Sequence, residues 1–126
     1  MPLPGHTPGH TGYLVASDGE SLLISGDFIH VPEVPVARPE VTIQFDMDPA
    51  QAAAARRRMP DMAASEQVHV AGMHLHVPGT AHIAREGHGD RLYPDAWENT
   101  TDGGARDRTP ARGAACRRDI SRYLRP

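Results

Sequence analysis

The sequence predicts an α/β fold in which a helix is layered on a sheet, and three observations support this class. Two apolar runs, at residues 11–17 and 21–27, are separated by the turn sequence Asp-Gly-Glu, which predicts a β-hairpin. An alanine-rich segment after residue 48 predicts a helix. A β-branched, apolar run at 67–72 predicts a further strand. The order strand, strand, helix, strand is typical of a sheet covered by helices.

The second strand and the segment after it differ in polarity. Residues 21–27 carry consecutive apolar side chains, so we expect this strand to be buried on both faces. Residues 31–46 are interrupted by prolines and show no clear period. This pattern predicts a long loop with a short extended piece at 41–45.

The helix has clear start signals and one internal breaker. Asp48 is a good N-cap, and Pro49 suits the first helical position. The Ala and Arg residues that follow have high helix propensity. Pro60 has no backbone N–H to donate, so we expect it to kink or end the helix near Met59, with residues 61–66 as a second helical piece.

The C-terminal part predicts a second hairpin and then a tail. A loop at 74–82 is followed by two short runs, 83–87 and 90–94, which we expect to pair with each other. Residues 98–126 are rich in Arg and poor in apolar side chains, which predicts a weakly ordered or disordered tail. The expected organisation is therefore one domain at 1–97 followed by this tail.

Composition and charge limit the expected binding partners and the expected cellular location. The 126 residues carry 13 Arg, no Lys and 16 Asp plus Glu, a formal net charge of −3. Residues 1–97 hold twelve of the acidic residues against six Arg, so we expect no nucleic-acid partner. No apolar run reaches the roughly 18 residues of a membrane span, and no signal peptide is visible. With a single cysteine, Cys116, the expected location is the cytoplasm.

Several imidazoles and one carboxylate stand next to predicted strand ends. They are His6 or His10 before the first strand, Asp27 at the end of the second, and His74 or His76 after the later strand. Zinc prefers such imidazole and carboxylate ligands, which a rigid sheet can aim from its edge loops. The alternative is that Asp27 caps a turn and the histidines are solvated.

Three strings carry a family resemblance. "PGHTPGHTGY", "LLISGDFIH" and "VAGMHLHVPGTAHI" resemble, in order and spacing, the second half of the metallo-β-lactamase-fold hydrolases. The resemblance covers residues 2–97, and the stretch 26–93 looks most like the branch that contains methyl parathion hydrolase. It implies roughly the second half of an αββα sandwich, with one sheet and its helix present and an inner sheet face left exposed.

The resemblance also implies roles for individual residues. His6 and His74 match metal ligands, and Asp27 matches the carboxylate that bridges two metals. Three further histidines are expected to support the site or to lie near its pocket: His10, His30 and His82. The implied cofactor is zinc or another divalent transition metal, two ions per intact relative.

One motif of the family is absent from the sequence. The string HxHxDH, which supplies ligands to both metals in the family, does not occur among the 126 residues. We therefore expect a truncated metal-dependent hydrolase that is inactive alone, with an ester, lactone or phosphotriester as the parent substrate class; whether this chain is an enzyme stays open. The alternative is a non-catalytic metal-binding or interaction module that pairs through its exposed sheet, as a homo-oligomer or with a complementing chain.

Overall fold

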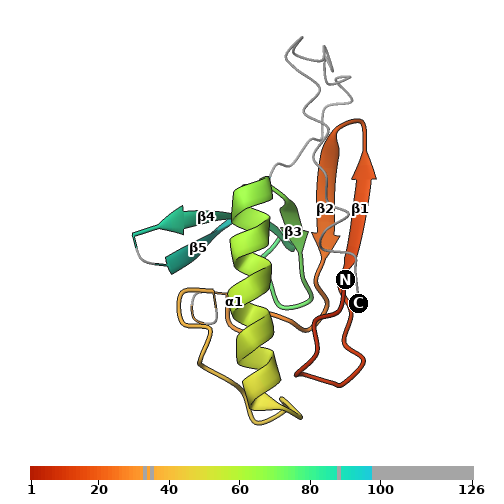
Figure 1. The fold of residues 1–126 in the computed structure, drawn as a ribbon. Helices are drawn as coiled ribbons and strands as arrows, with labels where there is room; N and C mark the ends of the chain where they lie inside the picture. The colour runs from red at the N-terminus through yellow and green to blue at the C-terminus, as the bar shows by residue number, and fades with distance from the viewer. Residues whose placement is uncertain (33, 35, 88, 98–126) are drawn as a thin grey trace.

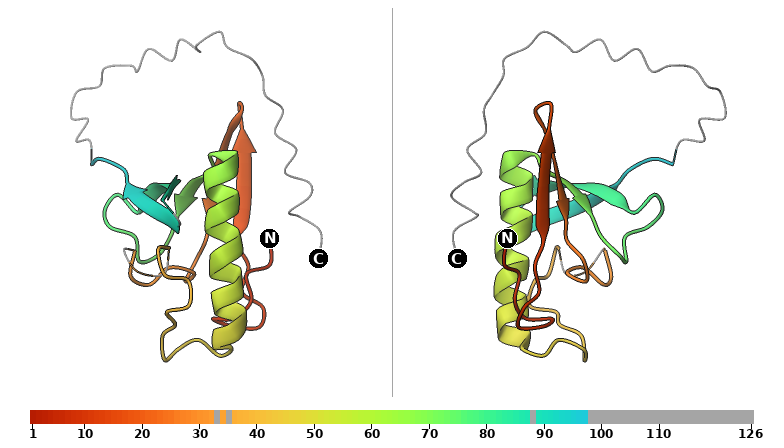
Figure 2. Two further views of the ribbon diagram at one scale, coloured as in Figure 1. Left: turned by 60° about the vertical axis from the view of Figure 1, so that its left-hand side comes forward. Right: turned by 90° about the vertical axis from the view of Figure 1, so that its right-hand side faces the viewer.

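A computed structural model describes residues 1–32, 34, 36–87 and 89–97 of the chain. Within them, the element order is β1 (Tyr13–Ser17), β2 (Glu20–Ile24), α1 (Pro49–Glu66), β3 (His69–Ala71), β4 (Thr80–Glu86) and β5 (Gly89–Pro94). The strands form one sheet in the order β1-β2-β3-β4-β5, and α1 runs along one face of it (Figure 1, Figure 2). The predicted α/β layered class is confirmed. The predicted tail at 98–126 lies outside the described residues.

The sheet is antiparallel apart from one pair of strands. β1 and β2 form the predicted hairpin, whose turn residues Asp18 and Gly19 both have positive φ, 52° and 85°. β2 and β3 are parallel, and α1 forms the connection between them. β4 and β5 form the second hairpin, and β4 also pairs with β3. Both predicted hairpins are therefore present.

Helix α1 differs from the prediction at Pro60. Asp48 caps it as expected, because its carboxylate accepts a 2.9 Å hydrogen bond from the Gln51 N–H. The helix does not end or restart near Met59, however, but continues through Pro60 to Glu66. A proline inside a helix costs about 3 kcal/mol. Burial of Met59, Pro60 and Met62 between the helix and the sheet offsets this cost, which local propensity cannot show.

Three further expectations about local structure were wrong. β2 is buried on one face only: Leu23 is fully buried, whereas Ile24 is 43% exposed, because among the described residues α1 covers a single face. Residues 41–45 form no strand, since the Ile43 N–H donates to the Asp46 carboxylate in a turn. β4 begins at Thr80 because Thr80 pairs with Ala71 of β3, so His82 lies in a strand and not in the predicted loop.

The core lies between α1 and the sheet face that it covers. Buried side chains from the strands meet the helix there, including Leu23, Val70, Ala81 and Ile83, together with Met59, Met62 and Ala63 of α1. The opposite sheet face, which we call the open face, carries Tyr13, Val15, Ile24 and Tyr93, each at least 43% exposed. This is the exposed inner face that the resemblance implied. None of the helices in the described part of the chain is long and apolar enough to cross a membrane.

Met59 tests whether this core holds the fold together. Met59 is fully buried at the centre of α1, whereas Met73, in the loop after β3, is 74% exposed. We expect Met59→Ala to lower the free energy of unfolding by about 2–5 kcal/mol, because it leaves a cavity against the sheet. Met73→Ala is the matched control and should change stability by less than about 0.5 kcal/mol. Urea denaturation followed by circular dichroism measures both, and equal effects would contradict this packing.

Candidate metal centre

The parallel pairing of β2 and β3 brings two donor residues to one edge of the sheet. Ile24 of β2 is in register with Ala71 of β3, and both strands run toward the same edge. Asp27 follows Ile24 by three residues, and His74 follows Ala71 by three. The two side chains therefore meet, with 3.1 Å between His74 Nε2 and an Asp27 carboxylate oxygen. The loops that carry them lie together at the lower end of the sheet in Figure 1.

Backbone contacts fix the two loops to each other. The Ser25 N–H and hydroxyl both donate to the Ala71 carbonyl, at 2.8 and 3.0 Å. Gly26 adopts φ 58°, a left-handed conformation that turns the chain sharply before Asp27. A Cβ on Gly26 would also come within 3.0 Å of His10 Nε2. The turn that presents Asp27 therefore requires glycine for both conformation and space.

His30 completes a group of three donors. One ligand atom each from Asp27, His30 and His74 lies within 4.8 Å of the other two. The His30 ring stacks on that of His74 at a centroid distance of 5.1 Å, and its buried Nδ1 has no hydrogen-bond partner among the described residues. Burial lowers the pKa of His30, and the neighbouring His6 and His74 imidazoles lower it further. His30 is therefore neutral at pH 7 and presents a nitrogen lone pair.

His6 reaches the same region from the N-terminal loop. Its ring lies 4.9 Å from that of His30, and it lines a small cavity together with Asp27, but it is not one of the three grouped donors. The loop is held against the start of α1 by backbone bonds from Met47 to the His6 carbonyl, 3.2 Å, and from Asp48 to the Gly5 carbonyl, 2.9 Å. His6 is thereby placed beside the group without any sheet pairing of its own.

A buried carboxylate orients His6. Asp46 Oδ1 lies 3.3 Å from His6 Nδ1, and both carboxylate oxygens accept hydrogen bonds from the Arg56 guanidinium, at 2.9 and 3.2 Å. Burial raises the pKa of Asp46, but the hydrogen bonds from Arg56 and from the Ile43 N–H lower it by more, so the group is ionised. An ionised carboxylate can only accept, so His6 Nδ1 is the donor in this contact, which leaves Nε2 of the neutral imidazole as the nitrogen available to a metal.

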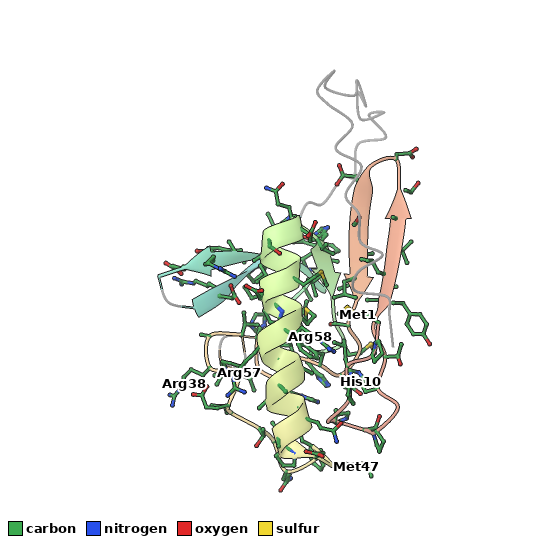
Figure 3. All side chains as sticks on the ribbon, in the orientation of Figure 1. Met1, His10, Arg38, Met47, Arg57 and Arg58 are labelled. Atoms are coloured by element: carbon green, nitrogen blue, oxygen red, sulfur yellow. The ribbon has the colours of Figure 1, made fainter. Side chains whose placement is uncertain are left out.

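The other predicted histidines lie in different surroundings. His10 donates from Nδ1 to the Leu3 carbonyl at 3.0 Å and anchors the N-terminal loop. Figure 3 labels it beyond the lower ends of β1 and β2. His76 is exposed in the loop after β3. His82, which the resemblance placed near the pocket, points to the open face and groups instead with His69 and Asp95. The expected pocket residues are thus separated, with His10 and His30 beside the centre and His82 elsewhere.

The donors at this edge fit a divalent transition metal. Two imidazoles and one carboxylate are the ligand types that zinc takes in sites with three protein ligands. The unpartnered His30 nitrogen supports this fit, because a buried polar atom without a hydrogen bond is costly unless a cation or another group satisfies it. The contact between His6 and Asp46 is also typical of metal sites, in which a carboxylate fixes the tautomer of a ligating histidine.

Sequence reasoning missed two residues of this site. Asp46 and Arg56 are buried, yet the sequence places Asp46 in a loop and Arg56 within a run of three arginines. Only tertiary contacts distinguish Arg56 from Arg57 and Arg58, because the helix turns one of the three guanidinium groups inward. Asp46 lies only two residues before the N-cap Asp48, and nothing in the local sequence distinguishes it as buried.

An α/β layer with imidazole and carboxylate donors at the ends of two parallel strands is typical of metal-binding hydrolase folds. The family model described as "Metallo-beta-lactamase superfamily" matches residues 1–67, more than half of the chain. The chain therefore belongs to the metallo-beta-lactamase superfamily. The narrower branch that contains methyl parathion hydrolase stays a prediction.

Solved structures agree with this assignment. The chain is 33% identical to the hydrolase AbOPH of the beta-lactamase superfamily, with a TM-score of 0.72 over 77% of this chain and 34% of that one. It is 28% identical to AidC, a dizinc quorum-quenching lactonase solved with a product, with a TM-score of 0.72 over 77% of this chain and 33% of that one. A probable metal-dependent hydrolase from Staphylococcus aureus shares the fold, at 22% identity and a TM-score of 0.58 over 72% and 32% of the two chains.

The matches cover most of this chain but only part of its relatives. The chain spans about a third of the length of these solved structures. No curated protein matches the sequence at a significant level. Within the described residues this chain has one sheet and one helix.

The Asp46–Arg56 pair yields a prediction for stability. Their side chains are 0% and 2% exposed, so Asp46→Asn leaves a buried guanidinium without its counter-charge. We expect the substitution to lower the free energy of unfolding by about 3–5 kcal/mol. Glu40→Gln is the matched control, because Glu40 pairs with Arg38 at an exposed position and should contribute less than about 1 kcal/mol. Chemical denaturation of both variants measures the difference.

The same pair predicts a pH dependence. Because folding lowers the pKa of Asp46, its stabilising contribution is present above the unfolded pKa of about 3.9 and is lost as the pH falls through the folded pKa. The stability difference between the parent and Asp46→Asn should therefore shrink as the pH is lowered from about 6 toward 3. A difference that stays constant over this range would mean that Asp46 is not held ionised by Arg56.

Proposed function

We propose that this chain carries one half of the dinuclear metal site of a metal-dependent hydrolase and is catalytically incomplete without the ligands that HxHxDH supplies in relatives. In this proposal His6 serves one metal, His74 the other, and Asp27 lies between them. The observation that carries it is the position of the two donors after β2 and β3. Asp27 and His74 each lie three residues after the register pair Ile24 and Ala71, so both donors stand at the same edge of the sheet.

His30 adds a donor to the incomplete site. Its unpartnered nitrogen lies beside Asp27 and His74, so the three residues offer one metal the three protein ligands that zinc sites with an open position use. A divalent metal held there would act as a Lewis acid on an ester, lactone or phosphotriester substrate and would acidify a coordinated water. The chain's own residues hold and orient the donors: Asp46 fixes the His6 tautomer, and Gly26 turns Asp27 toward His74.

The relatives and the chemistry of the donors support a substrate class for this proposal. AidC is a lactonase and AbOPH a hydrolase, which supports an ester, lactone or phosphotriester as the substrate of the assembled enzyme. Zinc is the favoured cofactor because AidC is a dizinc enzyme and the donors here are imidazole and carboxylate. The missing ligands would come from a complementing chain or segment.

Zinc titration tests the half-site. We expect His74→Ala and Asp27→Asn to weaken zinc binding at the sheet edge at least tenfold in calorimetry, since each removes one of three ligands. His6→Ala should remove a second, weaker equivalent bound at the same edge. His76→Ala is the matched control, because His76 belongs to neither donor group. Far-ultraviolet circular dichroism confirms folding of each variant. Equal binding by all four variants, or ester hydrolysis by the chain alone, would contradict the proposal.

A second candidate function is pairing through the open face without catalysis. Four apolar side chains are exposed on that face: Tyr13, Val15, Ile24 and Tyr93. Exposed apolar surface of this kind favours association. If this is the function, the chain forms a stable oligomer in sedimentation velocity, and Val15→Glu converts it to a monomer. Val77→Glu, at a more exposed valine in the loop after β3, should leave the oligomer intact. A parent chain that sediments as a monomer would exclude this function.

A further inference from the structure

A second cluster of donors lies on the open face, away from the sheet edge. Val70 of β3 pairs with Ala81 of β4, and the next step of this antiparallel register sets His69 opposite His82. Asp95 follows β5 directly, and its N–H donates to the Thr80 carbonyl at 3.1 Å. Three neighbouring strands therefore position the cluster. It shares no residue with the group formed by Asp27, His30 and His74.

The ligand atoms of the three side chains lie close together. The His69 and His82 rings are stacked, with 4.2 Å between centroids and 3° between planes. One Asp95 oxygen lies 2.5 Å from His69 Nε2, and the other lies 3.8 Å from His82 Nε2. The ligand atoms of all three residues lie within 4.8 Å of one another. The Thr80 hydroxyl donates to Asp95 at 2.5 Å and fixes the carboxylate in place.

The chemistry of the donors favours a cation at this point. The Asp95 carboxylate accepts a hydrogen bond from the Thr80 hydroxyl and faces Nε2 of His69. Two stacked imidazoles 4.2 Å apart would repel each other if both were protonated. A divalent metal instead takes both rings in the neutral form and places its charge beside the carboxylate. The donor set of two imidazoles and one carboxylate is one that zinc uses.

The spacing also suits metal coordination. Zinc bonds of about 2.0–2.2 Å in a tetrahedral site place neighbouring ligand atoms roughly 3.3–3.5 Å apart. The distance from one Asp95 oxygen to His69 Nε2 is 2.5 Å and that from the other oxygen to His82 Nε2 is 3.8 Å, on either side of this value. A metal held here would require rotation of the Asp95 carboxylate and of the His82 side chain, which is 61% exposed.

We propose that His69, His82 and Asp95 form a second, independent binding site for a divalent transition metal on the open face. The site has three protein ligands and one position open to solvent, since the side chain of His82 is largely exposed. Thr80 is a positioning residue, because it contacts Asp95 and contributes no ligand atom to the group. This site needs no complementing chain, because two of its ligands lie in neighbouring strands and the third, Asp95, directly follows β5.

In the test, substitutions first remove the sheet-edge site, which is formed by the donors around Asp27 and His74. The full-length variant chain is then titrated with zinc. The background variant is His6→Ala, Asp27→Asn, His74→Ala. We expect it to bind one equivalent of zinc in calorimetry, and the further substitution His82→Ala to weaken this binding at least tenfold. His82 is exposed, so its removal should leave the circular dichroism spectrum unchanged. The control adds His76→Ala to the background and should retain the full affinity.

A spectroscopic measurement identifies the ligands directly. Long-range ¹H–¹⁵N spectra of the background variant should show the ring nitrogens of His69 and His82 shifting on addition of one equivalent of zinc, with the other histidines unchanged. Thr80→Val should weaken binding less than His82→Ala does, because it removes only the bond that positions Asp95. The proposal would be overturned if the background variant bound no zinc, or if His82→Ala left its zinc affinity unchanged. Either result would count against the proposal whether or not the sheet-edge site binds metal.

Discussion

The buried guanidinium of Arg56 is the interaction on which the arrangement of the sheet edge depends. From α1 it donates to the carboxylate of Asp46, to the Phe28 carbonyl at 3.2 Å and to the Val41 carbonyl at 3.4 Å. One helical residue thus holds the loop after β2, which carries Asp27, and the loop before α1, which carries the partner of His6. A buried charge is tolerated only when such bonds satisfy it, so the loops and the helix constrain one another.

A second constraint is that the helix covers only one face of the sheet. The covered face is packed with aliphatic side chains and forms the core, whereas the open face mixes exposed aromatic and aliphatic residues with the donors His69, His82 and Asp95. In a two-sheet sandwich, a second sheet packs about 10 Å from such a face. The same face therefore carries both the apolar surface that favours association and a cluster of metal-binding side chains.

The distribution of donors follows from the topology. The parallel junction of β2 and β3 is the place where α1 connects two neighbouring strands, and donors on the loops after both strands meet there. The antiparallel pairing of β3 with β4 instead sets residues opposite each other within the sheet, which is how His69 and His82 stack. One short sheet thus gathers ligands in two different ways, at a strand edge and across a strand pair. Under the proposed function, the ligands that complete the metal site would enter at this edge.

The sequence by itself determined the class of fold, the hairpin turns, the cap at Asp48 and the superfamily. These features rest on local periodicity, on turn and cap chemistry, and on short strings such as the one that contains Asp27. Tertiary structure alone decided that α1 runs through Pro60, that β4 starts early enough to include His82, and that Arg56 and Asp46 are buried together. Those outcomes depend on which faces are covered and on which distant residues meet. Such contacts join positions ten to forty residues apart, and no local pattern in the chain encodes them.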